Sequence, residues 1–349
     1  MNIKHLFVAS AALLAMAACS SDDRQAPGEQ TQYPIRLSNN LVAPGDATRA
    51  TGNYAAGFIA GSEFWVWADM TDEGESDVRF RIKEFIPAWK LTVNAADAST
   101  FDTETTQTFP VYNKLSFYAM HGNFSSTFTA GQSSFPGVLT HSVMTTQQSD
   151  GDYLASDLVY AVKADVTPTA SVVPLEFYHM LTKIEVALKA GNQMTEAALK
   201  TVDDTKVTVS ILGTKTQVQF RPSKSTDHVP STLEGRAYML TIPEAAVAQP
   251  ITLSTVTTDD FTDGTCAAAI VVPQTVDGRF IRLSYMGHDT YYSVSNLELK
   301  SGYRYRFNLT VDRIGEEFFV TPSLTVSPWG ADTDVPADLK NITGTTERN

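Results

Sequence analysis

Apolar and polar residues alternate over short stretches of the chain, and this alternation predicts β-strands. The clearest stretch is residues 303–311, where every second side chain is apolar and those between are polar. Such a period of two is typical of a strand with one buried and one solvent-facing side. Residues 64–68 and 115–120 are apolar at both parities, as expected of strands covered on both faces. Because turn residues recur at short spacing between these stretches, the sequence predicts an all-β fold of the sandwich type.

The alternation changes face once, between residues 175 and 188. The inward positions are odd-numbered up to residue 181 and even-numbered from residue 184 onward. A one-residue slip turns every following side chain to the opposite face, so this change predicts a bulge or bend near residues 182–183. The preceding residues, 165–174, hold two prolines and no strong pattern, and we place a domain boundary there.

A helical pattern is visible in one place only. Residues 195–202 fit about two turns of helix, with Thr195 as the N-cap. Near the C-terminus, Pro322 and Pro328 interrupt an apolar stretch. Because proline cannot donate to a sheet ladder, residues 317–329 are predicted to form two short strands joined by a bend. The predicted fold is therefore all-β with one short helix, followed by a polar, mobile tail over residues 330–349.

The first 19 residues have the pattern of an export signal. Lys4 supplies a positive charge, residues 6–16 are apolar but too few to span a bilayer, and Cys19 follows small residues. This is typical of a lipoprotein signal, in which the Cys19 thiol becomes the thioether to a lipid. It predicts a lipid anchor in the outer membrane, at the cell surface. The alternative is an ordinary signal peptide with an incidental cysteine.

The charge balance excludes one large class of partner. The chain has 26 Lys and Arg against 39 Asp and Glu, a formal net charge of −13. Nucleic-acid binding depends on a basic surface that attracts phosphates, so no nucleic acid is expected as a partner. With 43% hydrophobic residues the chain can bury a core of ordinary size.

Residue patterns that carry catalysis are missing from the sequence. Its six histidines stand at no metal-ligand spacing, and it has no nucleophile elbow, phosphate-binding loop or dinucleotide motif. His179 is interpreted as a core histidine rather than a general base, and Cys266 as a buried residue rather than a nucleophile. The acidic stretches 69–77 and 259–264 are interpreted as solvated loops, with calcium binding as the alternative. We therefore predict no enzyme activity, no cofactor and no metal.

Three pairs of short blocks resemble the fimbrillin proteins of Bacteroidales, which are the subunits of type V pili. The blocks are Thr48-Arg49-Ala50 with residues 61–66, residues 157–160 with 177–186, and residues 270–274 with 297–305. Together with the leader, the ordered set spans nearly the whole chain. The chain departs from the family at Gly61-Ser62-Glu63, where the family motif usually has Gly-Asp.

The resemblance implies two β-sandwich domains of transthyretin-like topology, over residues 50–170 and 171–329. It also implies that an extracellular arginine-specific protease cuts the precursor between Arg49 and Ala50. Residues 20–49 would then combine a flexible tether with a removable strand.

The residues indicate what such a cut would do. Residues 33–42 fit a strand, and the small and polar residues after it give a protease access to Arg49. Removing the strand would leave unpaired backbone groups and an uncovered apolar face, which another extended strand can fill.

The C-terminal stretch 317–329 offers such a strand. Its apolar side chains are the candidate donor residues, namely Phe318, Val320, Leu324, Val326 and Trp329. Residues 326–329 also resemble a segment near the end of fimbrillins. Burying five such side chains would contribute about 8–15 kcal/mol before association costs are subtracted. The alternative is that residues 317–329 complete their own domain.

Two hypotheses about function follow. The first is a structural subunit of a type V fimbria, exported as a lipoprotein, cut after Arg49 and polymerised by strand donation, which supports cell adhesion. Its partners would be other fimbrial subunits and the protease, and the sequence does not decide between shaft and tip. The second is a monomeric surface lipoprotein that acts as an adhesin or binds glycans, which would need neither the cut nor the donor strand.

Overall fold

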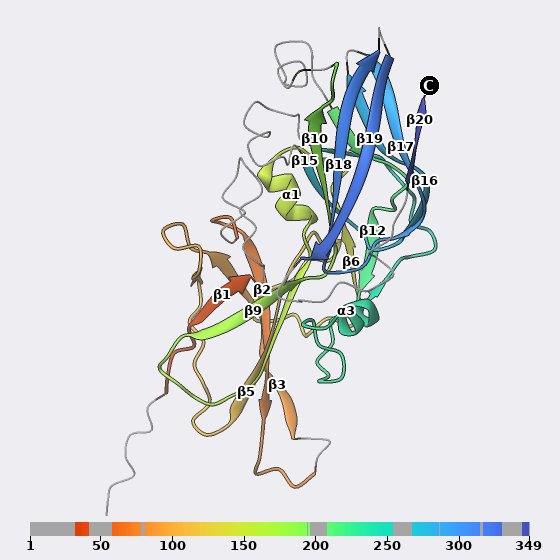
Figure 1. The fold of residues 1–349 in the computed structure, drawn as a ribbon. Helices are drawn as coiled ribbons and strands as arrows, with labels where there is room; N and C mark the ends of the chain where they lie inside the picture. Colours follow the sequence, from red (N-terminus) through yellow and green to blue (C-terminus); the bar gives the residue numbers. More distant parts are fainter. Residues whose placement is uncertain are drawn as a thin grey trace, which may run out of the picture. The chain divides into compact units, whose positions relative to one another are not determined.

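The alternating stretches of the sequence form β-strands that pair into sheets (Figure 1). The structure is a computed structural model. It describes residues 32–41, 58–77, 81–193, 195, 208–253, 267–285, 287–314, 317–329 and 344–348. Residues from Gln32 to Asn349 group into one compact unit. The predicted all-β class is confirmed, since the described residues are mostly in strands that build several sheets.

A seven-stranded sheet, called here the N-terminal sheet, has the strand order β1-β9-β8-β5-β2-β3-β4. Its strands are β1 (Leu37–Leu41), β2 (Glu63–Thr71), β3 (Ile82–Val93), β4 (Phe101–Asp102), β5 (Lys114–His121), β8 (Val159–Val166) and β9 (Val173–His179). Neighbouring strands run antiparallel except β1 and β9, which run parallel.

Both faces of this sheet are buried along β2 and β5. Phe64 and Phe117 belong to one core cluster, whereas Trp67 and Tyr118 belong to the other. Because successive side chains of a strand point to opposite faces, a strand covered on both sides must be apolar at both parities. The prediction for residues 64–68 and 115–120 is therefore confirmed.

Three further sheets contain the described strands that follow residue 181. The four-stranded sheet has the order β15 (Ala267–Val271), β10 (Thr182–Ala190), β18 (Tyr303–Ile314) and β19 (Glu317–Pro328). The six-stranded sheet has the order β20 (Gly344–Arg348), β17 (His288–Glu298), β16 (Thr275–Tyr285), β11 (Thr208–Ile211), β14 (Ile251–Leu253) and β7 (Thr146–Gln147). The three-stranded sheet has the order β13 (Leu240–Thr241), β12 (Gln217–Phe220) and β6 (Leu139–Ser142).

The predicted change of face marks a change of sheet. Strand β9 ends at His179 in the N-terminal sheet, and β10 begins at Thr182 in the four-stranded sheet. Phe177 lies in the core cluster of the N-terminal sheet, and Ile184 lies in the other cluster. The division into two domains near residue 170 stays a prediction. The chain leaves the N-terminal sheet for the last time at Met180 and Leu181, although β6 and β7, which precede residue 170, already belong to the other sheets.

The C-terminal stretch differs from its prediction in two ways. Residues 317–328 form one continuous strand, so the predicted bend between two short strands is wrong. Pro322 and Pro328 are tolerated because β19 is the outermost strand of its sheet in the described residues. The two prolines are also an even number of residues apart, so the two backbone positions that lack an N–H group lie along the same edge of β19. The tail, predicted to be mobile, contains strand β20, which pairs with β17.

Two short helices are described, α1 (Asp150–Ser156) and α3 (Leu233–Met239), and the sequence predicted neither. Each begins after a hydroxyl N-cap, since the Ser149 side chain accepts from the Asp152 N–H and the Thr232 side chain from the Gly235 N–H. The predicted helix over residues 195–202 lies outside the described residues except for Thr195. No helix in the described part of the chain is long and apolar enough to cross a membrane.

Candidate functional site

The described segment upstream of Arg49 contains β1, and one side of it is buried. Ile35, Leu37 and Asn39 are 5%, 6% and 7% exposed, whereas on the opposite side Arg36 and Asn40 are exposed and Ser38 is half-buried. The alternation of the sequence explains this pattern, because every second residue of an extended chain points to the same side. The strand predicted over residues 33–42 is thus present as β1 with the extended residues before it.

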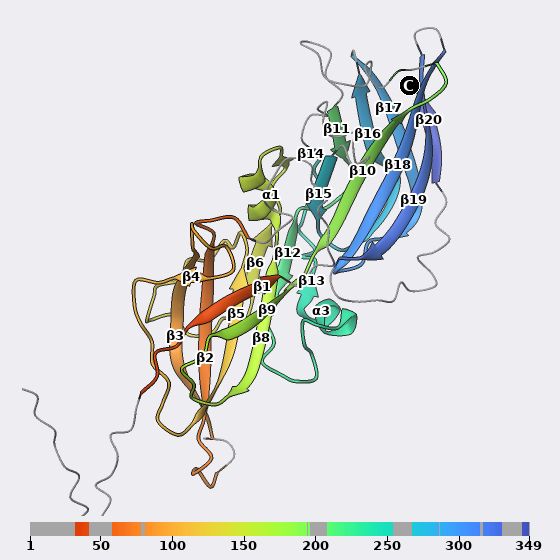
Figure 2. The same ribbon diagram turned by 60° about the vertical axis from the view of Figure 1, so that its left-hand side comes forward.

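The first edge of β1 pairs with β9, a strand more than a hundred positions later in the sequence. The pairing is parallel and runs from Leu37 opposite Val173 to Leu41 opposite Phe177. Just before β1, the Val173 N–H donates to the Arg36 carbonyl at 2.8 Å. Figure 2 shows β1, in red, beside β9.

The second edge of β1 is also hydrogen-bonded. The Ile35 N–H donates to the Gln107 carbonyl at 2.8 Å, and the Phe109 N–H donates to the Tyr33 carbonyl at 2.9 Å. Further along, the Asn39 N–H donates to the Ser99 carbonyl at 2.9 Å. We call the space that β1 occupies between β9 and residues 98–109 the β1 slot.

The interior side of the β1 slot is aromatic. Ile35 and Leu37 share a core cluster with Phe58, Phe64 and Phe177. The phenyl rings of this trio lie close together, with centroids 4.6 Å apart for Phe58–Phe64 and 4.9 Å apart for Phe64–Phe177. Burying two aliphatic side chains against such a surface contributes roughly 3–6 kcal/mol. A strand is therefore held in the slot by backbone pairing and by burial together.

The candidate donor residues lie in a different sheet from β1. Strand β19 pairs antiparallel with β18 along its whole length, from Glu317 opposite Ile314 to Pro328 opposite Tyr303. Phe318 and Val320 are part of this ladder, Leu324 and Val326 are half-buried against the core, and Trp329 is 5% exposed. In this structure residues 317–329 complete their own sheet, and donation to another subunit stays a prediction.

One contact links the last residue of this stretch to the N-terminal sheet. The Trp329 ring stacks on His179, the last residue of β9, with centroids 3.7 Å apart and planes 9° apart. His179 Nδ1 lies 2.9 Å from the carboxylate of Asp157, and both side chains are buried. His179 is therefore a core histidine held by a buried partner. The same strand, β9, pairs with β1 at one end and contacts Trp329 at the other.

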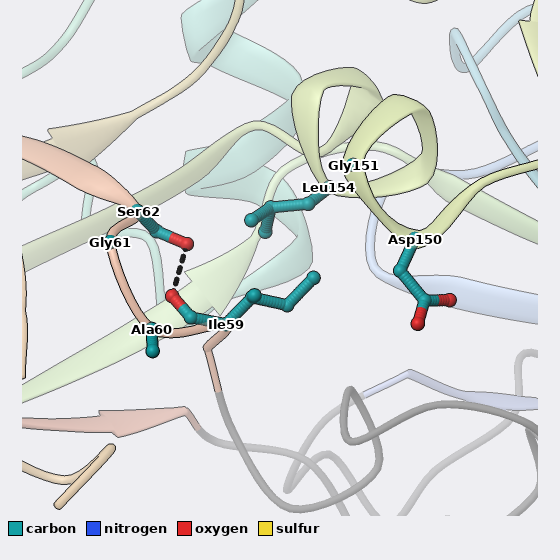
Figure 3. A pocket seen from close by; sticks show the side chains of 7 residues that line it. All are labelled: Ile59, Ala60, Gly61, Ser62, Asp150, Gly151 and Leu154. Atoms are coloured by element: carbon teal, nitrogen blue, oxygen red, sulfur yellow. Dashed lines mark hydrogen bonds between the residues drawn. The ribbon is translucent and has the colours of Figure 1, made fainter. Parts of the chain in front are cut away.

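A pocket of about 360 Å³ opens between the turn before β2 and helix α1 (Figure 3). It is lined by Ile59, Ala60, Gly61, Ser62, Asp150, Gly151 and Leu154. Ile59 and Leu154 extend into it from its two sides, and the Ser62 hydroxyl donates to the Ile59 carbonyl at 2.5 Å. Among these residues Asp150 is the single ionisable side chain, so the lining lacks the paired groups that acid–base catalysis uses.

The acidic stretch 69–77 is paired with lysines. Lys224 Nζ lies 2.7 Å from both carboxylate oxygens of Asp69, and Lys114 Nζ lies 2.9 Å from Glu73. The hydrogen bond from Lys114 holds the pKa of the exposed Glu73 carboxyl below its usual value. Within the described residues no group of three His, Cys, Asp or Glu side chains could hold a metal ion. Asp69 itself is buried in strand β2, so the interpretation of this stretch as a solvated loop is wrong at that residue.

Several predicted positions lie outside the described residues. They are Cys19, Arg49, Ala50, Cys266 and the acidic stretch 259–264. Conversely, the sequence did not point to the residues that flank β1, namely β9 and residues 98–109. Nothing in a single sequence marks a parallel partner so distant, and only the apolar alternation of residues 173–177 indicates that a strand is there.

Comparisons with known proteins give one family and a shared fold. A family model described as fimbrillin-like matches residues 48–329. A proposed cell adhesion protein from Bacteroides ovatus ATCC 8483 aligns with a TM-score of 0.58 and 14% identity, over 86% of this chain and 99% of that chain. One from Bacteroides uniformis ATCC 8492 aligns with a TM-score of 0.52 and 20% identity, over 87% of this chain and 100% of that chain. No curated protein matches the chain.

Proposed function

The chain belongs to the fimbrillin-like family, and from this we propose that it is a structural subunit of a type V fimbria that supports cell adhesion. The role is mechanical and adhesive rather than enzymatic, and its place is the fimbrium at the cell surface. Its partners are other fimbrial subunits. The matched region, residues 48–329, begins just before the predicted cut and ends with the last candidate donor residue, Trp329.

The observation that carries the proposal is the β1 slot. Strand β1 ends at Leu41, upstream of Arg49, and it is hydrogen-bonded on both edges and buried on one side. Loss of β1 from a cut subunit exposes the backbone of β9 on one side and residues 98–109 on the other. Such an opening accepts an extended strand from another subunit, which restores both ladders and the burial.

The maturation steps in this proposal rest on the sequence. Export attaches a lipid to Cys19 and places the precursor in the outer membrane. An arginine-specific protease then cuts between Arg49 and Ala50, which frees the subunit from its lipid anchor once β1 departs. The small residues and the one carboxylate of Gly45-Asp46-Ala47, just before Arg49, support access for such a protease.

Residues 317–329 are the proposed donor strand, and the structure sets a condition on this role. Because β19 pairs with β18 along its whole length, donation requires β19 to leave its own sheet. The outermost position of β19 among the described strands and its single partner favour such a departure over that of any central strand. The alternating apolar residues of β19 suit a slot with one buried side.

The test is controlled cutting of the purified precursor. We expect an arginine-specific protease to produce a chain that begins at Ala50 and then a ladder of oligomers on gel filtration and native electrophoresis. The Arg49→Gln variant is expected to stay monomeric under the same treatment. N-terminal sequencing distinguishes this cut from cleavage at Arg24 or Arg36, which also lie in the first 49 residues.

A second candidate function is favoured by one observation. Since residues 317–329 complete their own sheet, the subunit is also suited to remain a monomer, as an adhesin or glycan-binding lipoprotein. Complete conversion to the Ala50 form without any oligomer, over a wide range of concentrations, would favour this alternative and reject polymerisation.

A further inference from the structure

The buried side of β1 carries one polar residue. Ile35 and Leu37 point into an aromatic core, and the next residue on the same side is Asn39, which is buried to a similar degree. Burying a carboxamide carries a desolvation cost that an aliphatic side chain of the same size avoids. The burial of apolar surface alone therefore does not account for an asparagine at this position.

Asn39 contacts the wall of the slot with two groups. Its backbone N–H donates to the Ser99 carbonyl and its side-chain Nδ2 donates to the Ala98 carbonyl, both at 2.9 Å. Two adjacent carbonyls of one turn therefore receive donors from one residue. If an oxygen stood in place of Nδ2, as in aspartate, two acceptor oxygens would face each other at this contact. The geometry therefore requires a hydrogen-bond donor at this position.

The turn that presents these carbonyls is fixed by its own hydrogen bonds. Asn94 Oδ1 accepts from the N–H groups of Ala96 at 2.7 Å and Asp97 at 2.9 Å. Asp97 Oδ1 accepts from the Ser99 N–H at 3.0 Å and the Ser99 hydroxyl at 2.6 Å. Because side chains of the turn itself make these bonds, the positions of the two carbonyls do not depend on β1.

A two-residue shift of β1 is the error that the slot must exclude. Such a shift keeps Ile35, Leu37 and Leu41 on the buried side, so apolar alternation alone does not prevent it. It does move Asn39 to a position opposite Val173 or Phe177, away from the Ala98 carbonyl. The buried carboxamide then loses its acceptor, as a buried asparagine does in a shifted coiled coil.

We propose that Asn39 is the residue that fixes the register of β1 in the β1 slot. Parallel to β9, the slot holds two apolar residues on its inward side, Ile35 and Leu37, and then a carboxamide at the third inward position. The rule concerns β1 itself, because the proposed donor strand, residues 317–329, contains no asparagine or glutamine.

Disulfide trapping in the uncut full-length chain tests the register. Ser38→Cys with Pro174→Cys reports the observed register, because these residues are direct partners, and Ser38→Cys with Glu176→Cys reports a two-residue shift. Both pairs are placed in a chain with Cys19→Ser and Cys266→Ser. Each is then combined with Asn39→Leu, which removes the donor, or with Asn40→Leu, the same change at the exposed neighbour.

With Asn39 present, the observed-register disulfide should form at least about tenfold more than the shifted one. Asn39→Leu should lower this ratio about tenfold while the protein stays folded by circular dichroism, and Asn40→Leu should leave the ratio unchanged. Asn39→Asp, of the same size but without the donor, should lower the yield of the observed-register disulfide. An unchanged ratio in Asn39→Leu would overturn the proposal. Since the chain is uncut, that result would leave the fimbrial proposal standing.

Discussion

His141 is wholly buried, and its two ring nitrogens have opposite hydrogen-bonding roles. Nδ1 accepts from the Asn123 N–H and Nε2 donates to the Ser156 carbonyl, both at 3.0 Å. This arrangement requires the neutral ring, because a protonated Nδ1 could no longer accept. Burial lowers the pKa of His141 from 6.5 to about 4.

We expect this histidine to make folding stability depend on pH in mildly acidic solution. The unfolded chain takes up the proton near pH 6.5 and the folded protein only near pH 4. The stabilisation is therefore complete above pH 6.5 and is lost as the pH falls toward 4, by about 3 kcal/mol in total. Urea unfolding near pH 7 and near pH 4 measures the loss.

The variant that tests this is His141→Gln. Its loss of stability between the two pH values should be smaller by about 3 kcal/mol than that of the unchanged protein. An equal loss in both proteins would show that His141 does not carry the effect.

Trp329 is expected to be a major contributor to stability. It is buried and stacks on His179, so Trp329→Ala should lower the free energy of unfolding by about 3–5 kcal/mol in urea titrations. The control is Tyr112→Ala, because Tyr112 is 75% exposed and its removal should change little. A loss below about 1 kcal/mol for Trp329→Ala would contradict the burial that the structure shows.

At the scale of single elements, β1 is expected to depend on its inward residues. Leu37→Asp places a carboxylate in the aromatic side of the slot, which should release β1. The Val173 amide donates to Arg36, so its hydrogen exchange should become at least about tenfold faster. Arg36→Ser, at an exposed position of the same segment, should leave this exchange rate unchanged. Equal protection in both variants would contradict the role of Leu37.

Strands with a clear period of two were predictable, and their partners were not. Residues 303–311 lie in β18 with alternate side chains buried, as their sequence indicates. The parity change near residue 182 was also visible, but local pattern cannot distinguish a bulge from a passage between sheets. The prolines in residues 317–329 favoured a break in the strand. No break occurs, because the outermost strand of a sheet needs no N–H donors along its free edge. The two helices were missed because seven residues hold too few turns for a period to show.

The same limit applies to the candidate site. A strand upstream of Arg49 was predictable from residues 33–42. Its two neighbours, β9 and residues 98–109, come from distant parts of the sequence and are chosen by tertiary packing. The buried asparagine in that strand was visible as a residue, yet its acceptor, the Ala98 carbonyl, belongs to a turn whose position no local pattern gives.

At the scale of the whole molecule, the two parts of the C-terminal region should have unequal importance. Deleting residues 330–349 removes β20 and keeps β19 and Trp329, and this chain is expected to stay folded. Deleting residues 317–349 also exposes the edge of β18 and removes Trp329 from the core. The longer deletion should therefore melt at a clearly lower temperature than the shorter one. It should still give a folded monomer, since the proposed donation also requires a subunit to stay folded without its own β19.

Thermal unfolding and gel filtration compare the two deletions. A monomeric 317–349 deletion with the same melting temperature as the full chain would contradict the contribution of β19. If both deletions lowered the melting temperature equally, the main contribution to stability would instead come from β20.

The bonds along both sides of β1 separate two events that are easily taken as one. Hydrolysis after Arg49 breaks one peptide bond, and it breaks none of the hydrogen bonds that Ile35, Asn39 and Val173 make across the slot. A nicked subunit would therefore keep its severed leader in place, bound only by non-covalent contacts, until thermal fluctuation or a competing chain dislodges it. In that case the speed of filament growth would be governed by the dissociation of a short peptide, and adding more protease would not accelerate it.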